Sequence, residues 1–162
     1  MDAPLPTRAL SVRQPWAWAI LFAGKDVENR SWQAVNHGLN VRGTIALHAA
    51  KGMTRAEYEG AKRFMADLDV ECPDACDLWR GAVIGTIEVV DVVKEHTSPW
   101  FFGPRGLILE NPRSCVPVPV SGALGYFEWQ SRRTDAFPQP AKWMLNDSLR
   151  NPPKPEPQGS LL

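Results

Sequence analysis

The chain has 162 residues, and its 18 Lys and Arg balance its 18 Asp and Glu, so the formal net charge is zero. This length suits one domain with a core of its own, and the neutral total argues against a protein that coats nucleic acid through bulk electrostatics. No apolar run approaches the length of a membrane span, the N-terminus does not resemble a signal peptide, and three cysteines are too few for a disulfide framework. We therefore expect a cytoplasmic domain that does not associate with membranes.

The charges are unevenly distributed along the chain. Up to Arg55 there are seven Lys or Arg against three Asp or Glu, whereas residues 56–77 carry two against seven. A locally basic face can therefore exist on a neutral molecule. We expect binding that is confined to a site rather than spread over the surface.

The first elements expected along the chain are a short helix over residues 16–23 and a strand over 27–32. The helix follows a proline, ends before a glycine, and is apolar almost all round, so it is predicted to be largely buried. Side chains alternate between the two faces of a strand. Glu28, Arg30 and Trp32 are therefore predicted to share one face.

The rest of the chain reads as a small β-rich domain with one more helix. A capping-box pattern that begins at Thr54 opens that helix. Alternating prolines restrict residues 116–120 to an edge strand or an extended segment. Residues from 131 onward are rich in proline and poor in apolar side chains, so we expect a tail that is disordered or locally docked. The other strands are expected over residues 43–50, 81–94, 107–111 and 125–129.

Lys25, Glu28 and Arg30 are the leading candidates for a binding site. A carboxylate can accept hydrogen bonds from a base, and the two cations can bind phosphate or carbonyl oxygen. The alternative is a structural ion pair. Glu88 is a lone carboxylate in an apolar strand, and we expect Lys25 or Arg30 to be its partner.

Aromatic and polar residues flank these charges. A base stacked on Trp16 or Trp32 would gain roughly 1–3 kcal/mol, although most tryptophans in a domain of this size are core residues. The amide of Gln14 either caps the first helix or reads a base edge. His48 is more simply explained as a hydrogen-bonded structural residue than as a catalyst.

The same residues carry a family resemblance. Gly24-Lys25-x-x-Glu28-x-Arg30 is similar to the Gly-x-Lys-x-x-Glu-x-Arg signature of the ASCH domain, one residue tighter at its start. The flanks also fit: Leu-Ser-x-x-Gln-Pro-Trp-Ala before it, Arg-Ser-Trp after it, then Arg-Gly-Thr-Ile-Ala-Leu-His-Ala-Ala-Lys. The pattern looks most like the ASCH domain of activating-signal cointegrator proteins. It implies an ASCH domain over residues 8–130, followed by the tail over 131–162.

The resemblance implies an α+β fold, a small, mostly antiparallel PUA-like β-barrel with flanking helices. It implies a module that binds RNA, DNA or a modified nucleoside. We expect no cofactor and no metal ion, because Cys72-x-x-x-Cys76 has no obvious source of a further ligand. The expected ligand-binding residues are Gln14, Pro15, Trp16, Lys25, Glu28, Arg30, Ser31, Trp32, His48 and Lys51.

An enzyme is the alternative function. Some ASCH-like proteins remove the acyl group from acetylated cytidine with a Lys, a Thr and a Glu. Here Glu28 stands where their motif has the threonine, which puts that mechanism in doubt. In this alternative Lys25 and Glu28 are the catalytic residues, with a lysine pKa lowered by burial.

Overall fold

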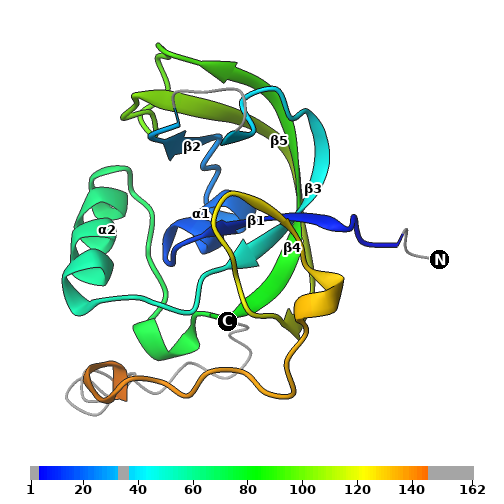
Figure 1. Ribbon diagram of the computed structural model, residues 1–162. Coiled ribbons are helices and arrows are strands. Elements are labelled where there is room, and N and C mark those ends of the chain that lie inside the picture. The colour runs from blue at the N-terminus through cyan, green and yellow to red at the C-terminus, as the bar shows by residue number, and fades with distance from the viewer. Residues whose placement is uncertain (1–3, 33–36, 146–162) are drawn as a thin grey trace, which may run out of the picture.

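The computed structural model describes residues 4–32 and 37–145. A six-stranded sheet in the order β2-β5-β4-β3-β1-β6 curls into half a barrel (Figure 1). β1 runs parallel to β3, and all other neighbouring strands are antiparallel. The α+β class and the mostly antiparallel sheet are therefore confirmed. The strands are β1 (Arg8–Val12), β2 (Val27–Arg30), β3 (Gly43–Ala49), β4 (Ala82–Val93), β5 (Arg105–Pro119) and β6 (Tyr126–Glu128).

Two α-helices lie on the concave side of the sheet, with α1 (Trp16–Phe22) nearer to it than α2 (Arg55–Asp67) (Figure 1). Ala17 and Ile20 of α1 pack into the core cluster of the sheet, whereas Ala19 belongs to a second cluster with the buried residues of α2. The first helix thus separates two apolar cores. The described residues also include two short 3₁₀ helices, η2 (Ala75–Asp77) and η3 (Gln130–Arg132), and a helical segment over residues 142–145.

The start of α2 has the predicted capping box. The Thr54 hydroxyl accepts a hydrogen bond from the Glu57 amide at 3.1 Å, and the Glu57 carboxylate accepts one from the Thr54 amide at 3.3 Å. These contacts satisfy two amides that lack partners inside the helix. The local sequence is therefore sufficient to fix where this helix begins.

Other elements differ from the prediction. β1 was not anticipated, because five residues flanked by prolines give too short an alternation. Residues 107–111 and 116–119 belong to one strand, β5, which continues through Asn111 at a φ of 53° and shifts its register against β4. The end of β5 pairs with β4 alone, as an edge. The first helix is less buried than predicted, since Phe22 is 60% exposed.

Side chains bridge the two ends of the curled sheet. Arg30 at the end of β2 donates a hydrogen bond across the opening to the Ser11 carbonyl of β1 at 2.7 Å. The ring of Trp32, just beyond β2, lies 5.5 Å from that of Tyr126 on β6. Among the described residues no strand pairing joins β2 to β6. We call this place the seam of the half-barrel.

The chain after β6 stays against the domain as far as it is described. Arg133 forms an isolated bridge with Val120, and Met144 is only 2% exposed. The remaining part of the predicted tail, residues 146–162, lies outside the described residues, so the boundary at residue 131 stays a prediction. No helix in the described part of the chain is long and apolar enough to cross a membrane.

Candidate functional site

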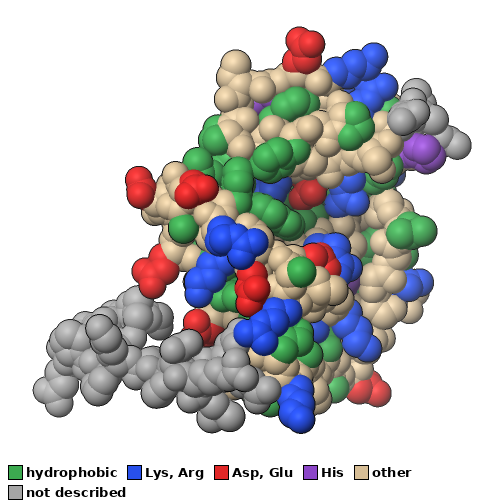
Figure 2. Space-filling view, turned by 90° about the vertical axis from the view of Figure 1, so that its left-hand side faces the viewer, with side chains coloured by type: hydrophobic (Ala, Val, Ile, Leu, Met, Phe, Trp, Pro, Cys, Tyr) green, Lys and Arg blue, Asp and Glu red, His purple; other side chains and the backbone are tan. Residues whose placement is uncertain are grey.

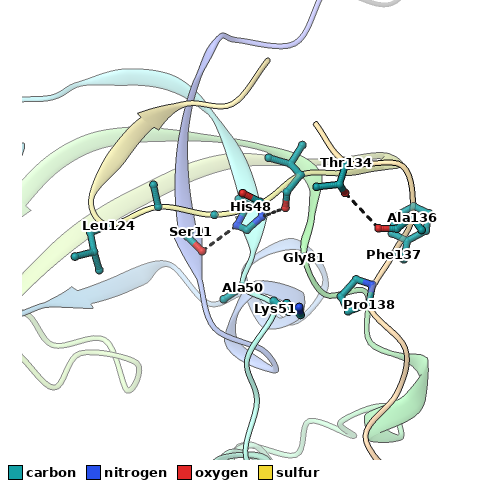
Figure 3. Close-up of a pocket in the computed structure, with 14 residues that line it drawn as sticks. Ser11, His48, Ala50, Lys51, Gly81, Leu124, Thr134, Ala136, Phe137 and Pro138 are labelled. Carbon is teal, nitrogen blue, oxygen red and sulfur yellow. Dashed lines mark hydrogen bonds between the residues drawn. The ribbon is translucent and has the colours of Figure 1, made fainter. Parts of the chain in front are cut away.

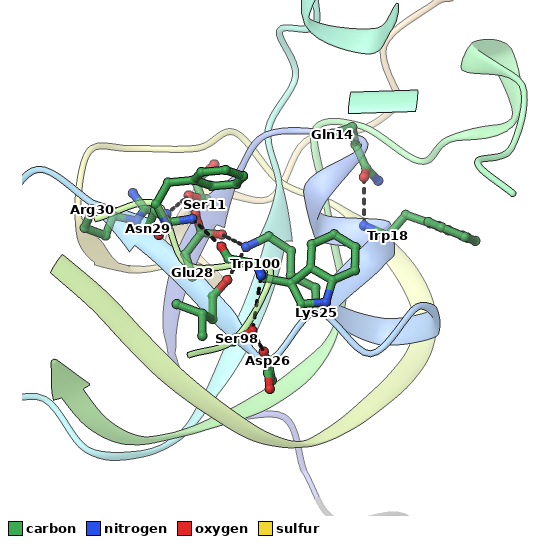
Figure 4. Close-up of polar contacts among 12 residues, drawn as sticks. Ser11, Gln14, Trp18, Lys25, Asp26, Glu28, Asn29, Arg30, Ser98 and Trp100 are labelled. Atoms are coloured by element: carbon green, nitrogen blue, oxygen red, sulfur yellow. Dashed lines mark hydrogen bonds and ion pairs between the residues drawn. The ribbon is translucent and has the colours of Figure 1, made fainter. Parts of the chain in front are cut away.

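Lys25 and Glu28 form a buried ion pair at the start of β2 (Figure 4). Lys25 is 4% exposed; its ammonium donates to the Val27 carbonyl and lies 3.8 Å from a Glu28 carboxylate oxygen and 5.8 Å from the ring of Trp16. Burial lowers the pKa of Lys25, and the charge of Glu28 opposes that shift. The structure therefore confirms that the two charges lie close together. Their role in binding or catalysis stays a prediction.

Three buried polar atoms near the seam have no hydrogen-bond partner among the described residues. They are the Oε2 atom of Glu28, the Nε atom of Arg30 and the hydroxyl of Tyr126. Buried polar atoms are almost always hydrogen-bonded, so each one requires an explanation. The face turned toward the viewer in Figure 2 is hollowed near its centre, and basic and acidic side chains lie side by side there.

A cavity of about 730 Å³ opens at the seam, and we call it the Trp32 cavity. The Arg30 guanidinium lies 5.2 Å from the ring of Trp32, within cation–π range. Burial raises the pKa of Tyr126, so its hydroxyl stays protonated at neutral pH and can donate. The cavity is lined by Arg8, Asn29, Arg30, Ser31, Trp32, His37, Gly38, Val41, Leu124, Gly125 and Tyr126.

A second cavity of about 720 Å³, the His48 cavity, lies beside Ser11 (Figure 3). The side chain of His48 is fully buried, with Nε2 2.7 Å from the Val120 carbonyl and Nδ1 2.9 Å from the Ser11 hydroxyl. A carbonyl only accepts, so Nε2 donates to Val120 and Ser11 donates to Nδ1. Burial lowers the pKa of His48, which agrees with this neutral ring. The residues that line the His48 cavity include Lys51, Gly81, Ser121, Leu124, Thr134 and Phe137.

Gln14 and Trp16 are committed to contacts inside the protein. Gln14 is 1% exposed; its amide donates to the Trp79 carbonyl at 2.7 Å and accepts from the Trp18 amide at 2.9 Å. Gln14 thus satisfies an amide in the first turn of α1 from the residue before the N-cap Pro15, which is the helix-capping role that the sequence offered as one alternative. Trp16 packs edge-on against Phe64 and Trp100, with ring centroids 5.8 and 6.4 Å away.

The predicted site residues are divided rather than gathered around one opening. Arg30, Ser31 and Trp32 line the Trp32 cavity, whereas His48 and Lys51 line the other. The remaining ones, Gln14, Pro15, Trp16, Lys25 and Glu28, line neither.

Sequence reasoning missed several residues of the seam. Arg8, Leu124 and Tyr126 line the Trp32 cavity, but they come from β1, which was not predicted, and from the turn and strand at β6. The Gly-Tyr-Phe pattern at residues 125–127 was read only as a strand. In the described part of the chain, no three His, Cys, Asp or Glu side chains are placed to hold a metal ion.

The expected partner of Glu88 was wrong. Its carboxylate accepts a hydrogen bond from the Asn111 side chain at 2.8 Å. Glu88 pairs with Thr44 and Glu110 in the sheet, and Asn111, next to Glu110, supplies the donor. The carboxylate is therefore satisfied locally and needs neither Lys25 nor Arg30.

Comparison with known proteins gives one informative similarity. The chain is 30% identical over 129 residues to activating signal cointegrator 1 of Homo sapiens, a match that covers 70% of this chain and 20% of the human protein. The chain thus corresponds to a small part of that relative. No family model matches the sequence.

Proposed function

We propose that the chain is an ASCH domain of PUA-like fold and that its Trp32 cavity binds a base of a nucleic acid or a modified nucleoside. The signature around Lys25, Glu28 and Arg30 and the similarity to activating signal cointegrator 1 support the family. The half-barrel with its flanking helices is compatible with it. The binding role rests on the chemistry of the seam.

The aromatic rings at the seam supply a surface for a flat ligand. Trp32 and Tyr126 meet at an angle of 52°, and both line the cavity. Stacking of a base on such a ring is worth roughly 1–3 kcal/mol. Arg8 and Arg30 line the same cavity and can contact a phosphate or a base carbonyl.

The observation that carries the proposal is the set of unpartnered polar atoms. Arg30 Nε is a donor and the Tyr126 hydroxyl donates or accepts, and both residues line the Trp32 cavity. A nucleobase edge presents donors and acceptors of the same kinds.

The direct test is binding of nucleosides and short single-stranded RNA and DNA, measured by calorimetry for wild type and Trp32→Ala. We expect Trp32→Ala to weaken binding about 10-fold, corresponding to the loss of one stacked base. Phe22→Ala is the matched control, because Phe22 is 60% exposed and lines neither cavity. Equal affinities for all three proteins would remove Trp32 from the site.

Hydrolysis of an N-acylated cytidine is a second candidate, favoured by one observation. Lys25 is buried, its pKa is lowered, and it faces a carboxylate with an unpartnered oxygen. A deprotonated lysine could take a proton from the water that attacks the acyl carbon and return it to the exocyclic nitrogen as the C–N bond breaks, which releases acetate and cytidine. The test is chromatography of acetylated cytidine incubated with wild type and Lys25→Ala. Cytidine release no faster than in the variant would dismiss this chemistry.

A further inference from the structure

We propose that the ligand is a single-stranded oligonucleotide that fills both cavities, with one nucleotide in the Trp32 cavity and a neighbouring one in the His48 cavity. This inference rests on the proposed function and makes it more specific. A free nucleoside would use one cavity only, whereas a strand would use both.

The two cavities are immediate neighbours. Leu124 lines both of them. Ser11 lines the His48 cavity, and its carbonyl accepts the hydrogen bond from Arg30, which lines the Trp32 cavity. A ligand that leaves one cavity past Leu124 therefore enters the other directly.

The lining of both cavities suits a phosphodiester strand. None of the described residues that line them is acidic, although the chain has as many acidic as basic residues. Arg8 and Arg30 supply positive charge in one cavity and Lys51 in the other. Each cavity also has an aromatic wall, Trp32 with Tyr126 in the first and Phe137 in the second. This is the combination of cations and stacking surfaces that binds single strands.

Residues 121–124 line the His48 cavity as far as Leu124, which also lines the Trp32 cavity, and we call this segment the ridge. The apolar side chain of Leu124, at the top of the ridge, is 99% exposed. Arg132 braces the base of the ridge, donating to the Ser121 carbonyl at 2.9 Å, the Ser121 hydroxyl at 3.2 Å and the Gly122 carbonyl at 2.6 Å. Apolar side chains in such positions pack against or between bases. A braced ridge also costs little entropy on binding, because it is ordered beforehand.

A duplex does not satisfy this geometry. Bases in a double helix are stacked on each other and paired, so their faces are not available to separate cavities. Two bases on either side of Leu124 must be unpaired. The inference therefore selects single strands over duplexes of the same sequence.

The experiment is a length series measured by calorimetry on the full chain. The four nucleoside 5′-monophosphates are compared first, and single strands of two to six nucleotides are then made from the base that binds best. We expect affinity to rise at least 10-fold between one nucleotide and three, and a duplex of the same length to bind at least 10-fold more weakly than the single strand. Equal affinity for all lengths, or for duplex and single strand, would overturn the inference.

Lys51→Glu separates this inference from the proposed function. Lys51 is exposed and lines only the His48 cavity, so the variant should lose the gain from length, measured as the ratio of its affinities for a trinucleotide and a mononucleotide. Lys94→Glu is the control, because Lys94 is also exposed and lines neither cavity. An unchanged gain in Lys51→Glu would overturn the two-cavity inference alone. Failure of wild type to bind any nucleotide at any length would overturn the proposed function as well.

Discussion

His48 makes the stability of the domain sensitive to pH. Its folded-state pKa is lowered by burial, so below the ordinary value of about 6.5 the unfolded chain binds a proton that the folded protein excludes. The free energy of unfolding should therefore fall as pH drops from about 7.5 through 6.5 toward the folded pKa. Chemical denaturation across this range measures the effect.

His48→Gln provides the control for that pH dependence. Losing the imidazole should cost about 1–3 kcal/mol at neutral pH, because the contacts to Ser11 and Val120 are disturbed. The part of the pH slope that belongs to His48 should disappear with it. If the free energy of unfolding of His48→Gln falls as steeply on acidification as that of wild type, another group is responsible for the pH dependence.

Cys72 should be far less reactive than its neighbour Cys76. Burial raises the pKa of Cys72 to about 11, so at pH 8 only about one molecule in a thousand carries the reactive thiolate. Cys72 is also buried, whereas Cys76 is half-buried. Mass spectrometry after brief alkylation should find the label on Cys76. Equal labelling of both would contradict the burial of Cys72.

Single residues show how far the sequence could lead to the site. The contact between Lys25 and Glu28 followed from their spacing around the start of a strand, because local geometry fixes it. Gln14 could not be assigned, since its contact with the Trp18 amide is local but its contact with the Trp79 carbonyl, 65 residues away, depends on how distant segments pack. Tyr126 was missed for the same reason: nothing near it in sequence indicates that β6 lies opposite Trp32.

Two glycines provide a matched test of the secondary-structure elements. Gly60 lies inside α2 with no atom within 4 Å of an added Cβ, so Gly60→Ala should raise the free energy of unfolding by about 0.5–1 kcal/mol. In β4, an added Cβ at Gly85 would lie 2.3 Å from the Arg113 carbonyl of β5. Gly85→Ala must therefore push the two strands apart.

The expected outcome is opposite signs for the two variants in urea denaturation. Gly85→Ala should destabilise by more than 1 kcal/mol, as overpacking of this kind does. The pairing of β4 with β5 is the longest in the sheet, so this loss should affect the whole domain. A neutral Gly85→Ala would show that the strands are not as close as described.

The sequence predicted α2 and the strands β2, β3, β4 and β6 close to where they lie, but it missed β1 and the full length of β5. The capping box and the apolar spacing of α2 are contained in its own residues. By contrast, β1 is stabilised by β3 and β6 on its two sides, and these come from distant parts of the chain. The length of β5 likewise depends on β4, which continues to pair with it beyond Asn111.

The molecule as a whole should bind nucleic acid through a small number of charges. The net charge is zero, and the cations that line the two cavities are few. Each phosphate contact to a single strand contributes about 0.7 to the slope of log affinity against log salt concentration. We expect a total slope magnitude of about 1–3 for a short strand, measured by fluorescence anisotropy between low and moderate salt. A slope magnitude well above that would indicate a broad electrostatic surface instead.

The most direct test of nucleotide binding at the seam is a titration followed by the indole N–H signals of the seven tryptophans in an NMR spectrum. The signal of Trp32 should shift on addition of a short single strand, because the base stacks on its ring. The signal of Trp18, whose ring packs against Phe22 and lines neither cavity, should stay in place. A strand that moves Trp18 and leaves Trp32 unchanged would contradict the account.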